Sequence, residues 1–254
     1  MANLYEGKRI GYADENKGLI SILIVTKNAE KYLVPCLESI ASQRFQNLEV
    51  IIFDGASTDN TVELLNENEH LITYWQSQPD NGIYEAMNEA LKRVRGNWLF
   101  FLGVDDVLLP TFSDMAEKLE KKNTIYTGDC ITDTGEILNG SYTAYGLTKV
   151  NICHQGIFYP STVFNNYIYQ PKYRVYADHV LNMQCWGDDS FKKQYFPILI
   201  TKYHLNGFSS FTKDVAFEND KPSLIKKYLG YYLYLRYRFK QWKEKGKQRK
   251  QQQV

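Results

Sequence analysis

The sequence of 254 residues contains few cysteines and no long apolar run. No stretch approaches the roughly 18–20 apolar residues of a membrane-spanning helix, and residues 1–18 lack the apolar centre of a secretion signal. The 4 cysteines lie far apart and form no C-x-x-C pair, which argues against a zinc knuckle and a small disulfide scaffold. We therefore expect free thiols and a chain that stays in the cytoplasm.

Two common nucleotide-binding signatures are also missing. Neither G-x-G-x-x-G nor G-x-x-x-x-G-K-[ST] occurs, which argues against a dinucleotide-dependent oxidoreductase and a P-loop enzyme. Lys and Arg total 30 against 29 Asp and Glu, and the mean hydropathy is −0.44, so the chain is neither a disordered polyelectrolyte nor a polytopic membrane protein. The length suits one large domain with an appendage.

Short apolar runs alternate with helix-like segments through the first part of the chain. Near-continuous apolar strands are typical of a parallel sheet that helices cover on both faces. The pattern therefore predicts a doubly wound α/β sheet. The predicted strands are residues 19–26, 48–54, 71–76, 97–104 and 124–130, and the predicted helices are residues 29–42, a helix opening near 59, 83–94 and 110–121.

Ligands of such sheets bind beyond the carboxyl ends of the strands, so polar residues that follow each strand are candidates for a site. These residues lie at 26–28, 54–57, 78–82 and 105–106. The adjacent acids Asp105 and Asp106 repel each other unless a cation neutralises them, which favours a site for Mg²⁺ or Mn²⁺. The alternative is an ordinary solvated turn.

The loop DGASTDNT, residues 54–61, joins a strand-end carboxylate to a glycine and to hydroxyl groups that lead into a helix. Such a loop suits recognition of a nucleoside near an anionic group at a helix N-terminus. The alternative is a plain strand-to-helix turn in which Thr58 or Asp59 caps the helix.

Three motifs in order carry a family resemblance. The runs SILIVTKNAEKYLVPCLESIASQ, EVIIFDGASTDNT and QPDNGIYEAMNEALKRVRGNWLFFLGVDD resemble the nucleotide-sugar-binding half of the family 2 inverting glycosyltransferases. The resemblance covers residues 19–109 and belongs to a subgroup with D-G-x-S-x-D-x-T and D-x-G-I-Y-x-A-M-N segments. It implies the GT-A fold, which is a Rossmann-like, mostly parallel sheet flanked by helices.

The resemblance also implies roles for single residues. Asp54 would contact the nucleotide base, usually uracil, Thr26 would lie near the nucleoside, and Asp105 would bind the metal. Gly103 departs from the family, because it stands where the D-x-D motif begins. The expected donor-binding residues are Thr26, Asn28, Asp54, Gly55, Ser57, Asp80, Gly82 and Asp105, and the expected metal ligands are Asp105, Asp106 and His204.

A base must take the proton of the acceptor hydroxyl, because a neutral alcohol attacks an anomeric carbon poorly. The segment YRVYADHVLNMQCW reads as an extended arm and a helix, and by the resemblance Asp178 is that base; the alternative is a helix N-cap. HQGIFYPS, residues 154–161, resembles the family segment before the base, so His154 and Gln155 are expected in the acceptor pocket. A half-buried structural histidine is the alternative for His154.

Residues 221–254 contain 11 Lys or Arg and a single acid, Glu244. Their three-or-four spacing of apolar residues predicts an amphipathic helix, followed by a disordered stretch of about ten residues. The helix could lie on an anionic membrane, pack on its own domain or on a second copy in a homodimer, or bind nucleic acid, which the acidic remainder of the chain disfavours. The apolar stripe is Ile225, Tyr228, Tyr232, Leu235, Phe239 and Trp242.

The sequence predicts a metal-dependent inverting enzyme that moves one sugar from a nucleotide diphosphate donor, a UDP-sugar, to a hydroxyl of a glycan or lipid-linked glycan. The chain lacks the Q-x-x-R-W motif of processive synthases. The alternatives are nucleotidyltransfer and a degenerate sugar-nucleotide-binding or scaffold protein. The expected divisions are an N-terminal extension at 1–18, a donor half at 19–109, an acceptor half at 110–220, and a basic tail at 221–254.

Overall fold

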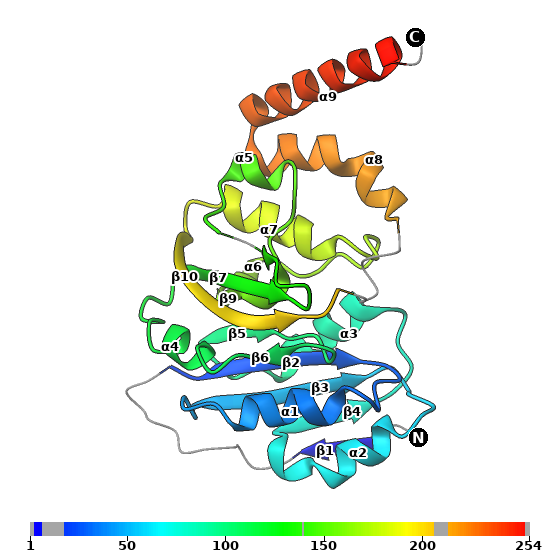
Figure 1. The fold of residues 1–254 in the computed structure, drawn as a ribbon, viewed down its shortest axis with the longest axis vertical. Helices are drawn as coiled ribbons and strands as arrows, with labels where there is room; N and C mark the ends of the chain where they lie inside the picture. Colours follow the sequence, from blue (N-terminus) through cyan, green and yellow to red (C-terminus); the bar gives the residue numbers. More distant parts are fainter. Residues whose placement is uncertain (1–2, 7–17, 139, 206–212, 252–254) are drawn as a thin grey trace.

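The computed structural model describes residues 3–6, 18–138, 140–205 and 213–251, with the side chains of 3–6 and 245–251 left out. Nine strands follow one another in a single sheet in the order β1-β4-β3-β2-β5-β9-β7-β10-β6, and β8 pairs with β7 (Figure 1). The strands are β1 Asn3–Glu6, β2 Ile20–Thr26, β3 Leu48–Asp54, β4 Tyr74–Ser77, β5 Trp98–Phe101, β6 Val107–Leu108, β7 Thr124–Thr132, β8 Ile137–Leu138, β9 Ile157–Pro160 and β10 Lys192–Tyr203.

The centre of the sheet is parallel, as predicted. Strands β4, β3, β2 and β5 run in one direction, and β10 runs parallel to β7. The antiparallel strand β9 joins β5 to β7, so that both halves of the chain share one sheet. Along β2, Leu23 packs into the core on one face while Ile22 and Ile24 pack into the core on the other. Burial on both faces explains why these runs are apolar throughout.

Helices cover both faces of the sheet. Helices α1 Leu33–Ala41, α2 Thr61–Glu67 and α4 Phe112–Ala116 contribute to one core, and α3 Ile83–Ala90 and α7 Ala177–Gly187 contribute to the other. The predicted helices exist but are shorter than expected, because turns precede α1 and follow α4. The remaining short elements are η1 Glu69–Leu71, η2 Leu91–Arg93, α5 Ala144–Leu147, η3 His154–Gly156 and α6 Val163–Asn166.

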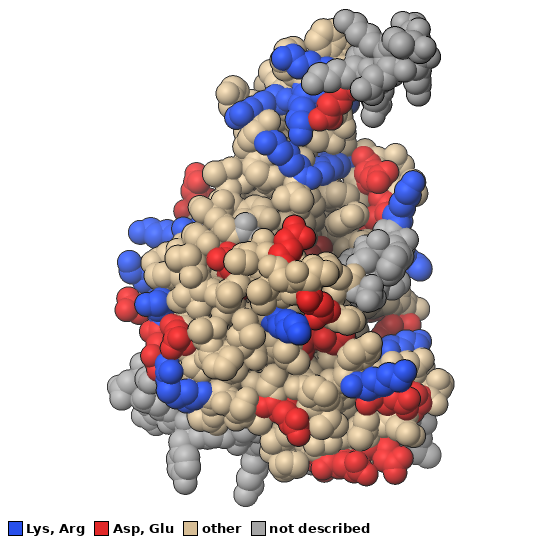
Figure 2. Space-filling model, viewed as in Figure 1, with Lys and Arg blue, Asp and Glu red and all other residues tan. Residues whose placement is uncertain are grey.

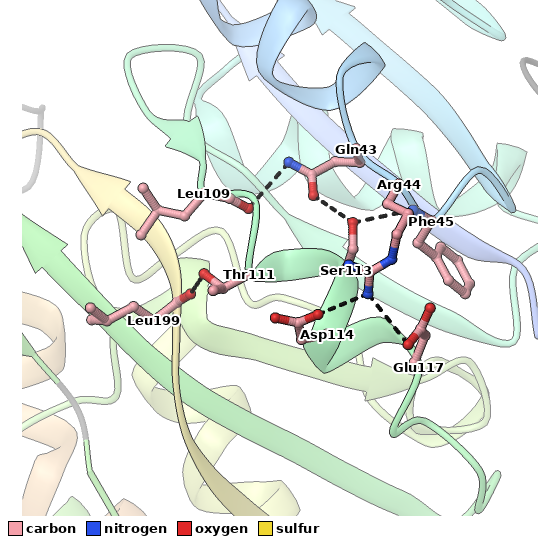
Figure 3. A network of polar contacts seen from close by, with 9 residues as sticks. All are labelled: Gln43, Arg44, Phe45, Leu109, Thr111, Ser113, Asp114, Glu117 and Leu199. Atoms are coloured by element: carbon pink, nitrogen blue, oxygen red, sulfur yellow. Dashed lines mark hydrogen bonds and ion pairs between the residues drawn. The ribbon is translucent and has the colours of Figure 1, made fainter.

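A polar network fixes α4 against α1 and β10 (Figure 3). The hydroxyl of Ser113 donates to Gln43 Oε1 at 2.9 Å, and Gln43 Nε2 donates to the carbonyl of Leu109 at 3.2 Å. Arg44 forms ion pairs with Asp114 and Glu117 at its outer edge. The network therefore anchors the segment that follows the acidic pair at the end of β5.

The basic tail is divided at Gly230. Helix α8 Val215–Leu224 continues into the π-helical turn η5 Ile225–Leu229, and α9 Tyr231–Gln251 starts after Gly230, whose φ is +92°. Ile225 is fully buried, and a Cβ on Gly187 of α7 would lie 1.8 Å from the carbonyl oxygen of Tyr228. A C-terminal helix exists as predicted, but the turn at Gly230 divides it, and the first part of the apolar stripe belongs to the core.

The second part of the stripe, on α9, faces solvent. Helix α9 projects from the end of the molecule and extends to Gln251, through most of the stretch expected to be disordered (Figure 1). Among the described residues no helix combines the length and the apolar character needed to cross a membrane. The exposed apolar side chains of α9 are Tyr231, Tyr232, Leu235, Phe239 and Trp242.

Candidate active site

Two cavities meet at the carboxyl ends of β2 and β5. The larger cavity, about 600 Å³, is lined by the loop after β2, by the start of α3 and by Arg174. The smaller cavity, about 500 Å³, reaches from the start of α3 to η3 and to Asp178. The residues common to both cavities are Val25, Ile83, Tyr84, Val104 and Asp105. Asp105 is therefore the one carboxylate shared by the two described linings.

The loop after β3 is held against the loop after β2. The backbone N–H of Asn28 donates to Ser57 Oγ at 2.7 Å, and Asn28 Oδ1 accepts the N–H of Thr58 at 2.8 Å. Asn28 and Ala56 have φ values of +53° and +55°, and asparagine adopts this left-handed region more readily than most residues. The two loops therefore form one rigid wall beside the larger cavity.

Asp54 lies within this wall and not on the larger cavity. Its carboxylate is buried and accepts hydrogen bonds from the N–H of Ser57 at 2.9 Å, the hydroxyl of Ser57, and the hydroxyl of Ser77 at 2.6 Å. It lines a separate hollow of about 150 Å³, which Asp80 also lines. The predicted contact between Asp54 and the nucleotide base stays a prediction, with Ser57 and Ser77 orienting the carboxylate.

Besides Asp105, four predicted donor residues line the larger cavity. Thr26, Asn28, Asp80 and Gly82 all do so, and the N–H of Gly82 donates to Asp80 Oδ1 at 2.9 Å. Gly82 has a φ of +133°, which requires glycine. Gly55 lies directly behind Asp80, since a Cβ at Gly55 would lie 2.7 Å from Asp80 Oδ2. These motif glycines therefore allow the backbone to approach the Asp80 carboxylate closely.

The larger cavity also holds features that suit an anionic ligand. The buried hydroxyl of Thr26 has no hydrogen-bond partner among the described residues, and such an unmet group costs free energy that a ligand can recover. Two exposed cations, Lys27 and Arg174, line the same cavity. Lys27 belongs to the strand-end group 26–28 that the sequence selected, although it was not among the expected donor-binding residues. No motif marks Arg174.

The acidic pair after β5 is divided between two roles. Asp105 is half-buried and faces both cavities, whereas Asp106 is 1 % exposed. Asp106 accepts hydrogen bonds from the N–H of His204 and from Nε2 of Gln155, both at 2.8 Å. Burial, together with the neighbouring Asp105, raises the pKa of Asp106 to about 8. These contacts favour a structural role for Asp106, and its part in metal binding stays a prediction.

Gly103 makes this arrangement of the acids possible. A Cβ at this position would lie 2.4 Å from Asp106 Oδ2 and 2.8 Å from Asp105 Oδ1. Glycine stands where the family's D-x-D motif begins, and its lack of a side chain leaves the space that the two carboxylates occupy. His204, the third expected metal ligand, lines the smaller cavity, and its Nδ1 contacts the carboxylate of Asp133. No cluster of three or more metal-ligating side chains occurs among the described residues.

Asp178 lies at the other side of the smaller cavity, at the second residue of α7. Tyr176 is the N-cap of that helix, so the interpretation of Asp178 as an N-cap is wrong. Asp178 Oδ1 accepts the N–H of His179 at 2.8 Å and lies 3.0 Å from the hydroxyl of Tyr84. Burial raises the pKa of Asp178 to about 6, against the lowering effect of these hydrogen bonds.

A chain of donors ends at the other oxygen of Asp178. Asn151 Nδ2 donates to Asp178 Oδ2 at 2.7 Å, and Asn151 Oδ1 accepts from Asn182 Nδ2 at 2.9 Å. Asn182 Oδ1 in turn accepts the hydroxyl of Tyr159 at 2.7 Å. Because each amide oxygen already accepts a hydrogen bond, Asn182 presents its N–H to Asn151, and Asn151 presents its N–H to the carboxylate. Asn151 and Asn182 carry no sequence signal that could have marked them.

The two residues expected in the acceptor pocket, His154 and Gln155, both line the smaller cavity. The ring of His154 stacks on Phe101 at 4.7 Å, and its Nε2 lies 2.8 Å from the hydroxyl of Tyr169. Burial lowers the pKa of His154 to about 3, so that the imidazole is neutral at physiological pH. Gln155 turns its amide to Asp106.

Residues 21–180 match the family described as "Glycosyl transferase family 2". The "PGL/p-HBAD biosynthesis glycosyltransferase" of Mycobacterium tuberculosis is 32 % identical over 217 residues, which cover 80 % of this chain and 84 % of that protein. "Chondroitin synthase" of Escherichia coli is 31 % identical over 159 residues, 58 % of this chain and 23 % of that protein. The chain therefore belongs to glycosyltransferase family 2.

Solved structures support the fold. The S. aureus TarS structure in complex with UDP-GlcNAc has a TM-score of 0.67 and 17 % identity, over 82 % of this chain and 64 % of that chain. The chain spans 43 % of the longer TarS structure. The Pyrobaculum calidifontis mannosyltransferase PcManGT, in complex with GDP-Man and Mn²⁺, has a TM-score of 0.56 and 15 % identity over 71 % of this chain and 55 % of that chain. The predicted GT-A fold is confirmed.

The series of hydrogen bonds that ends at Asp178 predicts a pH effect. Asn151→Ala removes a hydrogen bond that stabilises the ionised carboxylate, so the pKa of Asp178 rises above about 6. If Asp178 is the base as predicted, the acidic limb of a kcat/KM profile for sugar transfer should move to higher pH by roughly 1 unit, since a hydrogen bond to a charged group is worth about 1.5 kcal/mol and one pKa unit about 1.4 kcal/mol. Asn88→Ala, which loses an amide bonded to the backbone of Tyr169, is the control. An acidic limb that stays in place in Asn151→Ala contradicts the role of Asn151.

Proposed function

We propose that this protein transfers a single sugar from a UDP-sugar to a hydroxyl of a glycan or lipid-linked glycan. The observation that carries the proposal is that Asp105 faces both cavities while Asp178 faces only the smaller one. A donor in the larger cavity would thus bring its diphosphate to Asp105, and an acceptor hydroxyl in the smaller cavity would lie beside Asp178. The TarS complex with UDP-GlcNAc supports a uridine nucleotide.

The proposed chemistry is a single displacement that inverts the anomeric carbon. Asp178 takes the proton of the acceptor hydroxyl while the acceptor oxygen bonds to the anomeric carbon and the bond to the diphosphate oxygen breaks. A carboxylate with a pKa of about 6 is largely ionised at neutral pH and is a stronger base than an ordinary aspartate. The hydrogen bonds from Asn151 and His179 hold it in one orientation.

Asp105 is the residue proposed to hold Mg²⁺ or Mn²⁺. One carboxylate fits such an ion, because these cations commonly keep one or two protein carboxylates and complete their shells with phosphate oxygens and water. When bound, the ion neutralises charge on the leaving diphosphate. Lys27 and Arg174, on the same cavity, supply further positive charge for that group. The Mn²⁺ in the PcManGT complex supports this proposal.

Asp105→Asn tests the metal role. The variant should lose transfer, and its Mn²⁺-dependent binding of UDP should weaken by more than the roughly 10–100-fold that removal of a supporting group near a metal costs. Calorimetric titration with UDP, with and without Mn²⁺, measures the effect. Asp189→Asn, a change at an exposed loop, is the control. Undiminished Mn²⁺-dependent binding in folded Asp105→Asn protein would refute the assignment.

Asp178→Asn tests the base. Because the base acts on the acceptor, kcat should fall by about 10²–10⁴-fold while the dissociation constant of the UDP-sugar stays near that of the wild type. Initial rates and donor titrations on the same preparation separate the two effects. A variant that keeps most of its rate excludes Asp178 as the base. Donor binding without transfer by the wild-type protein, for any UDP-sugar, would instead favour the scaffold alternative.

We further propose that α9 lies on the surface of an anionic membrane, with its exposed rings at the headgroup level. Residues 231–251 contain 8 Lys or Arg and only Glu244 as an acid. Figure 2 shows Lys and Arg side chains gathered around the end of the molecule that carries α9. Each cation near such a surface contributes up to about 1 kcal/mol, and salt weakens the attraction.

Phe239→Ser combined with Trp242→Ser tests this proposal in the full chain. Both side chains are exposed, at 55 % and 69 %, so the fold should be unaffected. The wild type should sediment with vesicles containing phosphatidylserine at low salt, and the double variant should be released at lower salt than the wild type. Neutral vesicles are the control. A wild type that ignores anionic vesicles refutes the proposal, and a change from dimer to monomer in the double variant would assign α9 to a homodimer interface.

A further inference from the structure

We propose that the acceptor carries an uncharged, apolar group next to its reacting hydroxyl, and that this group binds at the mouth of the smaller cavity, on Leu138 and Val150. The inference rests on the proposed function, because it names the class of acceptor that the same cavity would take. It concerns the wall formed by Leu138, Tyr142, Val150 and Ile152, to which no role is assigned above.

This wall of the smaller cavity is mainly apolar, with the amide of Asn151 between Val150 and Ile152. Leu138 of β8, Tyr142, Val150 and Ile152 contribute to the lining. Val150 is 57 % exposed although it lines the cavity, so its side chain lies where the cavity opens to solvent. An exposed valine at a cavity mouth gains free energy when a ligand covers it, and a purely polar ligand provides no such gain.

The charges around the cavity argue against an anionic acceptor. Among the described residues of the lining, none is Lys or Arg, and the acids are Asp105 and Asp178. His154 is neutral and therefore gives no positive charge. A phosphate or carboxylate on the acceptor next to the reacting hydroxyl would lie beside Asp178, and no Lys or Arg of the described lining offsets that repulsion. His204 also lines the cavity, but its ring contacts the carboxylate of Asp133. An uncharged neighbour avoids that repulsion.

The apolar mouth is adjacent in the chain to the group that holds the base. Val150 precedes Asn151, whose amide donates to Asp178 at 2.7 Å, and the carbonyl of Asn151 accepts the hydroxyl of Tyr142 at 3.1 Å. The segment that bears Val150 is therefore tied both to the base and to the neighbouring wall. When the reacting hydroxyl of the acceptor lies beside Asp178, the part of the acceptor next to that hydroxyl would lie at Val150. An acceptor with an apolar group at that position fits this arrangement.

Binding of paired glycosides tests the proposal without knowledge of the acceptor sugar. Methyl and octyl β-glucoside, below the concentration at which the octyl compound forms micelles, are titrated into UDP-loaded protein in a calorimeter. The octyl compound should bind at least about tenfold more tightly than the methyl compound, because several methylene groups leave water. Equal affinities overturn the proposal.

Substitutions locate the octyl group. Val150→Ser should reduce the preference for the octyl compound by about threefold or more, whereas Ile168→Ser, at a residue that is 59 % exposed and outside the lining, should not change it. The Phe239→Ser and Trp242→Ser double variant shows whether the octyl group of the ligand binds to α9 instead. A loss of the octyl preference in this variant would also overturn the proposal. Absence of sugar transfer would refute the proposed function but would leave the binding preference intact, so the two failures are distinguishable.

Discussion

The buried carboxylate of Asp106 joins the two halves of the chain, and the site depends on this junction. It follows β5 and accepts hydrogen bonds from His204 at the end of β10 and from Gln155 just before β9. A carboxyl group this deeply buried requires hydrogen-bond partners, because its lost hydration is costly. The hydrogen bonds to Asp106 fix the position at which β10 ends and leave Asp105 facing the two cavities. Gly103 permits the junction, since a side chain there would collide with Asp106.

The first half of the fold could be predicted because its signals are local. Strands β2 and β3 are continuous apolar runs, and the rule that ligands bind beyond strand ends correctly selected residues that line a cavity, such as Thr26, Asp80 and Asp105. The pairings of β9 and β10 were not predicted, because their aromatic and mixed segments become strands only through partners distant in sequence. Tertiary context decides such strands.

The site was predicted only where motifs mark it. Asp178, which the resemblance selected, lies on the smaller cavity. Of its supporting amides, Asn182 is on the same predicted helix but carries no motif, and Asn151 comes from a segment without a pattern, so that the two meet only in the fold. The apolar spacing of the tail predicted the C-terminal helix but not its division. The spacing continues across Gly230, whereas the backbone turns there, so that one stripe serves both the core and solvent. Periodicity records which residues are apolar and not what covers them.

The wall shared by the two cavities has a consequence for inhibitor design. Because Val25, Tyr84 and Asp105 contribute to both linings, a ligand in one cavity ends within reach of the other. On the proposed function, a compound that links a uridine diphosphate to an apolar alcohol would meet its second subsite at a high effective concentration once the first half had bound. Such a bisubstrate compound would need only a short tether, and its selectivity over other nucleotide-sugar enzymes would come from the half proposed to bind at Val150.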